Sequence, residues 1–300
     1  MSNRRITRRD FLKVAAVTPI AGALVPGLKG VQSAQKAEPL KKVRVVLVRD
    51  KNALDASRRH NPEVIQKMLD DAVTTLLGEN DPIKAWKMLI KPNDIVGIKT
   101  NVWNYIPTGE AVEQALKRRV MDAGVPEDSI SIDDRGVLVN PIFKKATALV
   151  NARPARSHHW AGMGSCIKNY ITFVPVPSDY HPDTCSNLAT IWYLRQVKDR
   201  TRLNVLVMLT PLFHGIGPHH YSKEYTWEYK GLIVSRDPVA ADSTGLRILQ
   251  AKRRQYFGED RPMQPTPHHI FLADAKHHLG VSNPDQIELV KLGWDEDILI

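Results

Sequence analysis

The chain has 300 residues, of which 43% are hydrophobic and 25% charged, and its formal net charge is +10 at pH 7. Seven of the 42 Lys and Arg residues and one of the 32 acidic residues lie in residues 1–37, which leaves 35 basic and 31 acidic residues and a net charge of +4 beyond that segment. Most of the basicity therefore belongs to the N-terminal segment, and a nucleic-acid partner is not expected.

The N-terminal segment has the features of an export signal. Thr7–Lys13 reads Thr-Arg-Arg-Asp-Phe-Leu-Lys and resembles the twin-arginine (Tat) signature, and an uncharged stretch rich in Ala and Gly follows from Val14 to Leu28. As a helix this stretch would reach about 22 Å, short of the roughly 30 Å hydrocarbon core of a bilayer. A basic arm ahead of a buried helix and a retained membrane anchor are the alternatives.

We expect residues 1–37 to be a Tat signal peptide and residues 38–300 to form the mature protein. The Tat export machinery is then a partner, and the mature chain works in the periplasm. No later stretch is long and apolar enough to span a bilayer, so no stable membrane span is expected in the mature form.

Strand and helix patterns alternate along residues 38–300. Short apolar runs predict strands at Val43–Val48, Ile95–Ile98, Ile130–Ile132, Leu203–Leu209 and Leu232–Val234, and an edge strand at Ile287–Val290. Helical spacing predicts helices over Pro62–Leu77 (with Asn61 as its cap), over Gly109–Ala123, and over roughly 186–198, 237–251 and 269–278. This alternation predicts a single α/β domain with a mixed or largely parallel sheet flanked by helices.

Binding sites in such sheets gather at the carboxyl ends of strands. That rule selects Lys99–Asn101, Asp133-Asp134 and Pro211–His220. The two cysteines, Cys166 and Cys185, are too few for a disulfide scaffold, and in an oxidising compartment they could either pair or remain free thiols.

The segment His158–Asn169 is the first candidate for chemistry. It contains His158 and His159, a glycine-containing turn, and then Lys168 and Asn169. Imidazole is a common ligand for borderline metals and carries protons near neutral pH, while a lysine can hold an anion or form a Schiff base. The alternative is a solvated polar loop.

The segment Pro211–His220 is the second candidate, directly after a very apolar run. Gly215 and Gly217 allow the backbone to approach a ligand closely, and His214, His219 and His220 surround them. The spacing matches no standard zinc motif, so the metal signal is unspecific. Taken singly, each of these histidines is explained as a surface or packed residue.

The segment Ser235–Asp242 is the third candidate. Asp237 with Pro238 is typical of a helix start, which accounts for this carboxylate structurally, and Asp242 could face the same pocket. His268-His269 and His277-His278 are expected at the surface. Phosphate-loop, dinucleotide, zinc-protease and nucleophile-elbow motifs are missing from the sequence, which disfavours the common nucleotide folds and serine hydrolases.

These motifs together resemble the family known as domain of unknown function 362, over about residues 43–292. The pieces that carry the resemblance are Ile98–Asn101 (IKxN), His158–Asn169 (HxxxGxxxxxKN), His214–Pro218 (close to EGxGP) and Asp237–Asp242 (close to DPVAVD). His214 stands where the family usually has Glu, and the ferredoxin-like cysteine run of many relatives is missing here. The resemblance therefore implies no iron–sulfur cluster in this chain, and it implies no established activity.

A dozen residues also resemble, more distantly, the cofactor-binding segment of nickel-pincer lactate racemases. His158–Gly162 followed by Lys168 has the spacing of that segment, although the Gly-Gly before the lysine is absent. This resemblance implies an organometallic cofactor near Lys168.

We therefore expect a periplasmic enzyme that uses a divalent transition metal or organometallic cofactor for redox or isomerisation chemistry on a small anionic substrate. The cofactor would lie between the loops His158–Asn169 and Pro211–His220. The expected catalytic residues are His158, Lys168 and Asp242; the cofactor-binding residues are Lys99, Asn101, Lys168, Asn169, Gly215 and Gly217; the metal ligands are His158, His159, His214 and His219. The alternative is a non-catalytic periplasmic binding protein or an accessory subunit co-exported with a redox partner protein.

Overall fold

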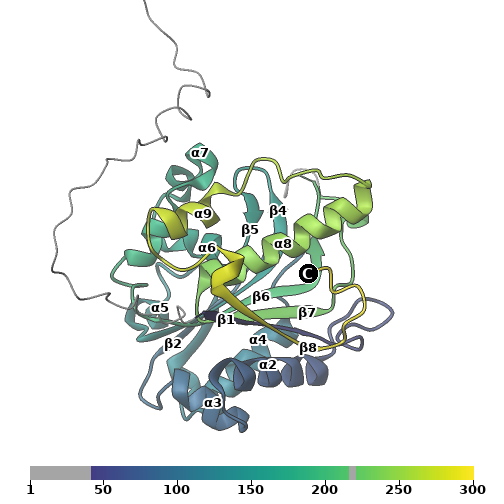
Figure 1. Ribbon diagram of the computed structural model, residues 1–300. Coiled ribbons are helices and arrows are strands. Elements are labelled where there is room, and N and C mark those ends of the chain that lie inside the picture. The colour runs from purple at the N-terminus through teal and green to yellow at the C-terminus, as the bar shows by residue number, and fades with distance from the viewer. Residues whose placement is uncertain (1–41, 216–220) are drawn as a thin grey trace, which may run out of the picture. The chain divides into compact units, whose positions relative to one another are not determined.

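The computed structural model describes residues 42–215 and 221–300, and Leu40–Ile300 form one compact unit. Its centre is an eight-stranded sheet of order β3-β2-β4-β6-β7-β1-β8, in which β5 pairs with β4 off this path (Figure 1). The strands are β1 (Val43–Arg49), β2 (Val96–Lys99), β3 (Ile130–Asp133), β4 (Ala148–His158), β5 (Gly162–Gly164), β6 (Thr201–Leu212), β7 (Gly231–Ser235) and β8 (Ile287–Gly293). The expected signal peptide, and His219 with Gly217, lie outside the described residues.

The sheet is mixed and mostly parallel, as the sequence predicts. Strands β3, β2, β4 and β6 run parallel to one another, and β1 is parallel to β8. Strand β7 is antiparallel to both β6 and β1, and the short β5 is antiparallel to β4. The edge position predicted for the last strand is confirmed.

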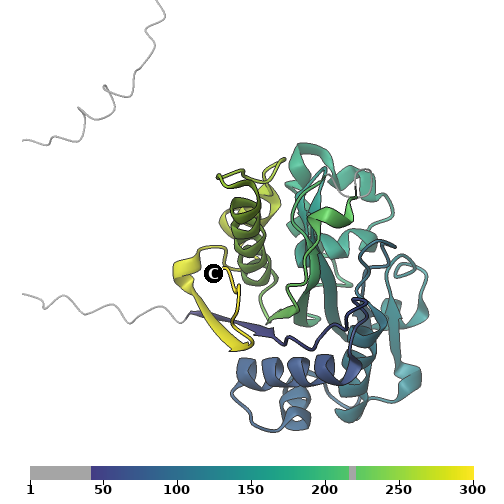
Figure 2. The same ribbon diagram turned by 90° about the vertical axis from the view of Figure 1, so that its right-hand side faces the viewer.

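Helices cover both faces of the sheet. They are α2 (Pro62–Leu77), α3 (Pro82–Leu89), α4 (Glu110–Asp122), α5 (Pro141–Lys145), α6 (Cys166–Asn169), α7 (Pro182–Cys185), α8 (Pro238–Phe257) and α9 (His268–Ala275). One hydrophobic core joins α2, α3 and α4 to one face of the sheet, and a second core joins α6, α8 and α9 to the other. Figure 2 shows α2 and α8 on opposite sides of β1.

The helix ends follow local signals in the sequence. Asn61 caps α2 by accepting a hydrogen bond from the backbone N–H of Val64, and Gly78 ends the helix in the left-handed conformation at φ 71°. Asp237 caps α8 by accepting from the N–H groups of Val239 and Ala240, which confirms its structural role. The helix predicted over 186–198 is wrong, because only a 3-10 segment, Leu188–Tyr193, forms there.

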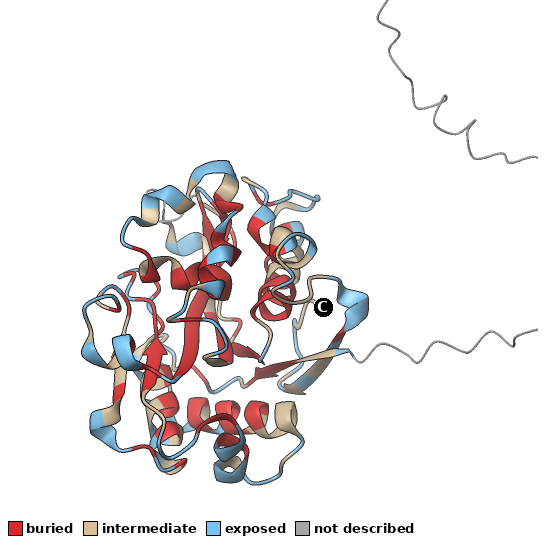
Figure 3. Ribbon diagram, turned by 90° about the vertical axis from the view of Figure 1, so that its left-hand side faces the viewer, coloured by how far each residue is buried: buried red, intermediate tan, exposed pale blue. Residues whose placement is uncertain are grey.

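Strand β4 lies near the middle of the sheet and was not expected from the sequence. All of its residues are buried (Figure 3). Arg153, Pro154 and Arg156 interrupt the apolar pattern, and the pairing of β4 with β6 shifts register between Pro154 and Arg156. Proline lacks the N–H that a central strand donates, so a register shift accommodates it. This strand carries the two arginines of the site described below.

Among the described helices, none combines the length and apolar character that a membrane crossing requires. Cys166 and Cys185 are both buried free thiols.

Candidate functional site

A cavity of about 300 Å³ lies at the carboxyl ends of the parallel strands β2, β3 and β4, beside α6. Its lining residues are Asn101, Trp103, Asp134, Arg135, Arg153, Arg156, His158, Trp160, Lys168, Asn169, Ile171, Thr172, Pro177 and His181. The structure therefore brings together five of the residues singled out from the sequence, namely Asn101, Asp134, His158, Lys168 and Asn169. At β2 and β3, the rule that sites collect at strand carboxyl ends selected the edge of the sheet on which this cavity lies.

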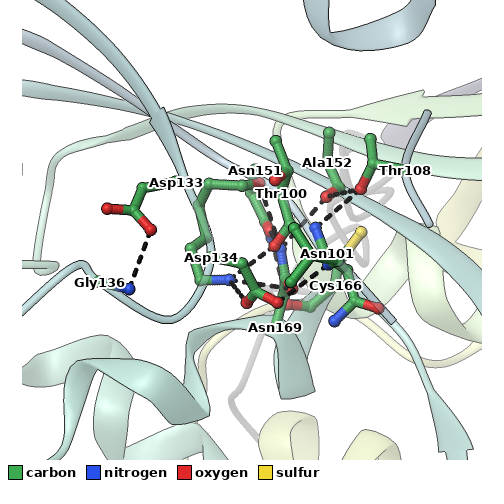
Figure 4. A network of polar contacts seen from close by, with 12 residues as sticks. Thr100, Asn101, Thr108, Asp133, Asp134, Gly136, Asn151, Ala152, Cys166 and Asn169 are labelled. Atoms are coloured by element: carbon green, nitrogen blue, oxygen red, sulfur yellow. Dashed lines mark hydrogen bonds and ion pairs between the residues drawn. The ribbon is translucent and has the colours of Figure 1, made fainter. Parts of the chain in front are cut away.

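Lys99 is fully buried and belongs to a polar network beside the cavity that includes Asp134 and Asn169. Figure 4 shows Asp134 and Asn169 in this network. Nζ of Lys99 is 2.5 Å from Oδ1 of Asp134 and 3.4 Å from Oδ1 of Asn169. Burial lowers the pKa of the Lys99 ammonium. Burial alone would raise the pKa of the Asp134 carboxyl, but the charge of Lys99 and the hydrogen bonds from Lys99 and Val102 together outweigh it and lower that pKa. The pair is therefore ionised at neutral pH. Lys99 holds the wall in place and does not line the cavity.

The amide of Asn169 ties α6 to the neighbouring strands. Its Nδ2 donates to the carbonyl oxygen of Lys99 at 3.2 Å and to Oδ1 of Asn151 at 2.8 Å. Oδ2 of Asp134 accepts from the backbone N–H of Val102 at 3.0 Å. Because these buried groups satisfy one another, the cavity has a rigid polar wall.

Arg153 and Arg156 extend from β4 and are the most unusual residues of the cavity. They are 3% and 5% exposed, and within the described residues neither forms an ion pair with a carboxylate. The Nε atoms of both side chains and Nη1 of Arg156 are buried without a hydrogen-bond partner. The Cζ atom of Arg156 lies 4.0 Å from the centre of the Trp103 ring, at the distance of a cation–π contact.

Lys168 adds a third buried cation. It is 2% exposed, and the hydrogen-bond contact of its Nζ is a weak one to Sγ of Cys185 at 3.7 Å. Burial raises the pKa of the Cys185 thiol, so this contact provides no formal negative charge at neutral pH. Burial lowers the pKa of the Lys168 ammonium to about 8, with a further contribution from the positive charge of Arg153.

His158 is held as a neutral ring in one tautomer. Its Nδ1 accepts hydrogen bonds from the backbone N–H groups of Trp160 at 3.2 Å and Ala161 at 3.4 Å. Burial, followed by the charges of Lys168 and Arg156, lowers the pKa of His158 far below its usual value. With Nδ1 as an acceptor, Nε2 carries the proton and is a hydrogen-bond donor.

That tautomer does not suit a metal ligand, since Nδ1 already accepts two amide protons and Nε2 carries the remaining ring proton. His159 stacks against His158, with ring centres 4.9 Å apart, and Trp160 lies 4.0 Å from the ring of His181. Across the described part of the chain, no group of three or more His, Cys, Asp or Glu side chains could hold a metal ion. The described residues therefore do not fit the expected metal centre.

Asp242 does not line the cavity, contrary to the expectation that it faces the same pocket. Its carboxylate accepts from Oγ of Ser165 at 2.6 Å and from the backbone N–H groups of Cys166 and Ile167 at 2.8 Å each. Burial outweighs these hydrogen bonds and raises the pKa of Asp242 to about 6. Asp242 is therefore a positioning residue that holds the start of α6, on which Lys168 stands.

The two histidine-bearing segments come close to each other, because the side chain of Ser157, the residue before His158, donates through Oγ to the carbonyl oxygen of His214 at 3.0 Å. The His214 ring, however, lies in other surroundings. Its Nδ1 is 3.0 Å from Nη1 of Arg253, and its ring centre is 4.6 Å from that of Tyr225. His214 and Gly215 are absent from the cavity lining, so His158 and His214 do not share the expected pocket.

A larger cavity, about 620 Å³, lies between the start of β1 and the N-terminus of α8. Its most prominent charged pair, Arg44 and Glu288, is an exposed ion pair, with Nε and Oε2 3.0 Å apart. Among the described residues that line this larger cavity, no buried cation lacks a partner. The smaller cavity, which has such cations, is therefore the better candidate for a binding site.

The fold and the cavity define an α/β protein with a buried, strongly cationic pocket at the carboxyl edge of its sheet. Residues 112–247 match the family described as Domain of unknown function (DUF362), so the chain contains a DUF362 domain. The matched residues include β4 and α6, which provide Arg153, Arg156, His158 and Lys168. No curated protein and no solved structure matched the chain.

Three residues of the cavity, Arg153, Arg156 and Trp103, were not predicted from the sequence. The available signal was the short apolar run Ala148–Val150, which begins β4. A strand predicted from this run and continued through the polar residues after it would end at His158. The rule for strand carboxyl ends would then have indicated Arg153 and Arg156 as candidate site residues.

Proposed function

We propose that the chain binds a small anionic molecule in the cavity beside α6. The observation that supports this function is the set of three buried cations, Arg153, Arg156 and Lys168, without a carboxylate ion pair among the described residues. An unpaired buried charge is strongly destabilising, so a partner from outside the chain is the natural counter-charge.

The residues have distinct roles in such a site. The guanidinium groups present planar sets of donors that match carboxylate or phosphate oxygens, and Lys168 contributes a compact positive charge. Nε2–H of His158 is a further neutral donor at the cavity wall. Trp103 covers one face of Arg156 and lowers the local dielectric, which strengthens each contact.

Lys168 also supports chemistry on the bound anion. A pKa of about 8 allows this side chain to release and accept a proton near neutral pH, as a general acid–base group must. Isomerisation of a small anion by proton transfer is therefore part of the proposal, whereas redox chemistry would also require an electron carrier from outside the chain. A non-catalytic binding protein or accessory subunit is the second candidate, and it would bind the same anion without turnover.

The binding function is tested by calorimetric titration of the full chain with inorganic sulfate, whose charge is constant between about pH 7 and pH 9. We expect the affinity to fall by about tenfold between these values, because Lys168 loses its proton above a pKa of about 8. Sulfate binding favours the protonated ammonium, so binding is strongest below that pKa and weakens above it.

Two variants make the test specific. Lys168→Met should weaken binding and flatten its pH dependence, whereas Lys144→Met, an exposed lysine on α5, should change neither. Sulfate binding that is independent of pH and unaffected by Lys168→Met would contradict the proposal. Circular dichroism of each variant verifies folding.

We also infer that the chain is exported by the Tat pathway and works in the periplasm. The support is the Thr7–Lys13 pattern and the uncharged stretch after it. Replacing Arg8 and Arg9 together by lysine should leave the protein in the cytoplasm on cell fractionation. Recovery of that double variant from the periplasm at the normal level would reject this inference.

A further inference from the structure

The buried charges around the cavity do not balance. Lys99, Arg153, Arg156 and Lys168 provide four positive charges, each on a side chain that is at most 5% exposed. The buried carboxylates beside them are those of Asp134, which pairs with Lys99, and Asp242, which accepts bonds from the start of α6.

The neighbouring carboxylate of Asp133 is only half-buried and does not line the cavity, so it is not counted among the buried charges. It accepts a hydrogen bond from the backbone N–H of Gly136 at 2.9 Å and another from Nδ2 of Asn140 at 2.9 Å. Figure 4 shows its side chain directed toward Gly136 and away from the Asp134–Asn169 network. Arg135, an exposed side chain at the cavity edge, adds positive charge and no negative charge.

From this charge count we propose that the ligand is a small dianion, such as a phosphate monoester or a dicarboxylate. The inference rests on the proposed anion-binding function and specifies its ligand. Guanidinium groups stay protonated in proteins, so Arg153 and Arg156 cannot remove the imbalance by losing protons. Four buried positive charges and two buried negative charges leave two positive charges, which a dianion neutralises.

The hydrogen-bonding groups and the size of the cavity support the same ligand class. The unpartnered donors, Nε of Arg153 and Nε and Nη1 of Arg156, are on two different guanidinium groups, so a ligand with several anionic oxygens can use both. The volume of about 300 Å³ is at the lower end of the roughly 300–1,000 Å³ range of ligand pockets, which excludes large ligands from full burial.

The test compares ligands that are matched in size and differ by one charge. The full chain is titrated with succinate and monomethyl succinate, and with methyl phosphate and dimethyl phosphate, at about pH 7.5, where a phosphate monoester carries nearly two negative charges. We expect the dianion of at least one pair to bind about tenfold or more tightly than its monoanion. Whichever dianion binds more tightly, succinate or methyl phosphate, identifies the ligand as a dicarboxylate or a phosphate monoester.

Arg156→Gln removes one of the two uncompensated charges and should reduce the preference for the dianion severalfold. Arg118→Gln, an exposed arginine on α4 at the opposite face of the sheet, is the matched control and should leave the preference unchanged. Equal affinities for dianion and monoanion would overturn the dianion inference and leave anion binding intact. No binding of any of the four probes would overturn both proposals.

Discussion

Replacing Arg156 with methionine will stabilise the ligand-free chain and abolish most of its anion binding. Arg156 is buried, carries an unpartnered Nε and Nη1, and lies close enough to Arg153 for the two positive charges to repel each other. Burial, followed by that repulsion, lowers the pKa of the Arg156 guanidinium well below its usual value. Methionine has a similar length and no charge, so it removes the cost of burying an unpaired cation.

The two effects of this substitution should have opposite signs. Replacing buried charges with apolar side chains is often stabilising by about 1–4 kcal/mol, and loss of the cation–π contact with Trp103 offsets about 1 kcal/mol of that gain. Sulfate affinity should fall by about 30-fold or more, since hydrogen bonds between charged groups contribute roughly 1.5–3 kcal/mol.

Thermal denaturation and calorimetric titration measure the two quantities on the same protein preparation. Arg118→Met on α4 removes an equally charged but exposed side chain and should alter neither. A marked loss of stability combined with undiminished sulfate binding would show that Arg156 is an ordinary structural residue.

Replacing Asp242 with alanine will destabilise the chain by about 3 kcal/mol or more. The substitution leaves the Ser165 hydroxyl and the N–H groups of Cys166 and Ile167 buried without an acceptor. Each unsatisfied buried donor costs roughly 1–3 kcal/mol. Anion binding should fall as well, because α6 carries Lys168 and Asn169.

Ser165→Ala is the matched control for Asp242→Ala, since it removes one of the three hydrogen bonds and leaves the carboxylate in place. It should cost about 1 kcal/mol and retain anion binding. Urea denaturation gives both free energies of unfolding. An Asp242→Ala variant as stable as the Ser165→Ala variant would mean that the carboxylate does not hold α6.

The pH dependence of stability has a defined sign at Asp242. Its pKa is raised from 3.8 to about 6 by burial, so between these values the folded chain binds a proton that the unfolded chain has already released. The contribution of this carboxyl group to stability is therefore largest below the lower value and declines as the pH rises to about 6. The alanine variant should lack this component.

The sequence predicted elements whose signals are local. Helix α2 begins and ends where Asn61, Pro62 and Gly78 indicate, because capping and the left-handed conformation depend on the residues at the helix ends themselves. The apolar runs of β1 and β7 predicted buried strands for the same reason. The alternation of helices and strands predicted a mixed or largely parallel sheet, and the sheet is mixed and mostly parallel.

The parts that escaped prediction depend on contacts between distant segments. Arg153 and Arg156 made β4 look unlike a buried strand, since their burial depends on a cationic cavity that the whole sheet creates. The direction of the His214 ring depends on Arg253 of α8, almost forty residues further along the chain. The spacing of residues within one segment predicts neither the burial of the two arginines nor the contact between His214 and Arg253.

The binding of an anion by Arg153, Arg156 and Lys168 is tested most directly by a crystal structure of the full chain grown with methyl phosphate. We predict the phosphate group in the cavity beside α6, within hydrogen-bonding distance of both guanidinium groups and of the Lys168 ammonium. A phosphate bound elsewhere, with these three side chains paired to carboxylates of the chain, would contradict the proposed site.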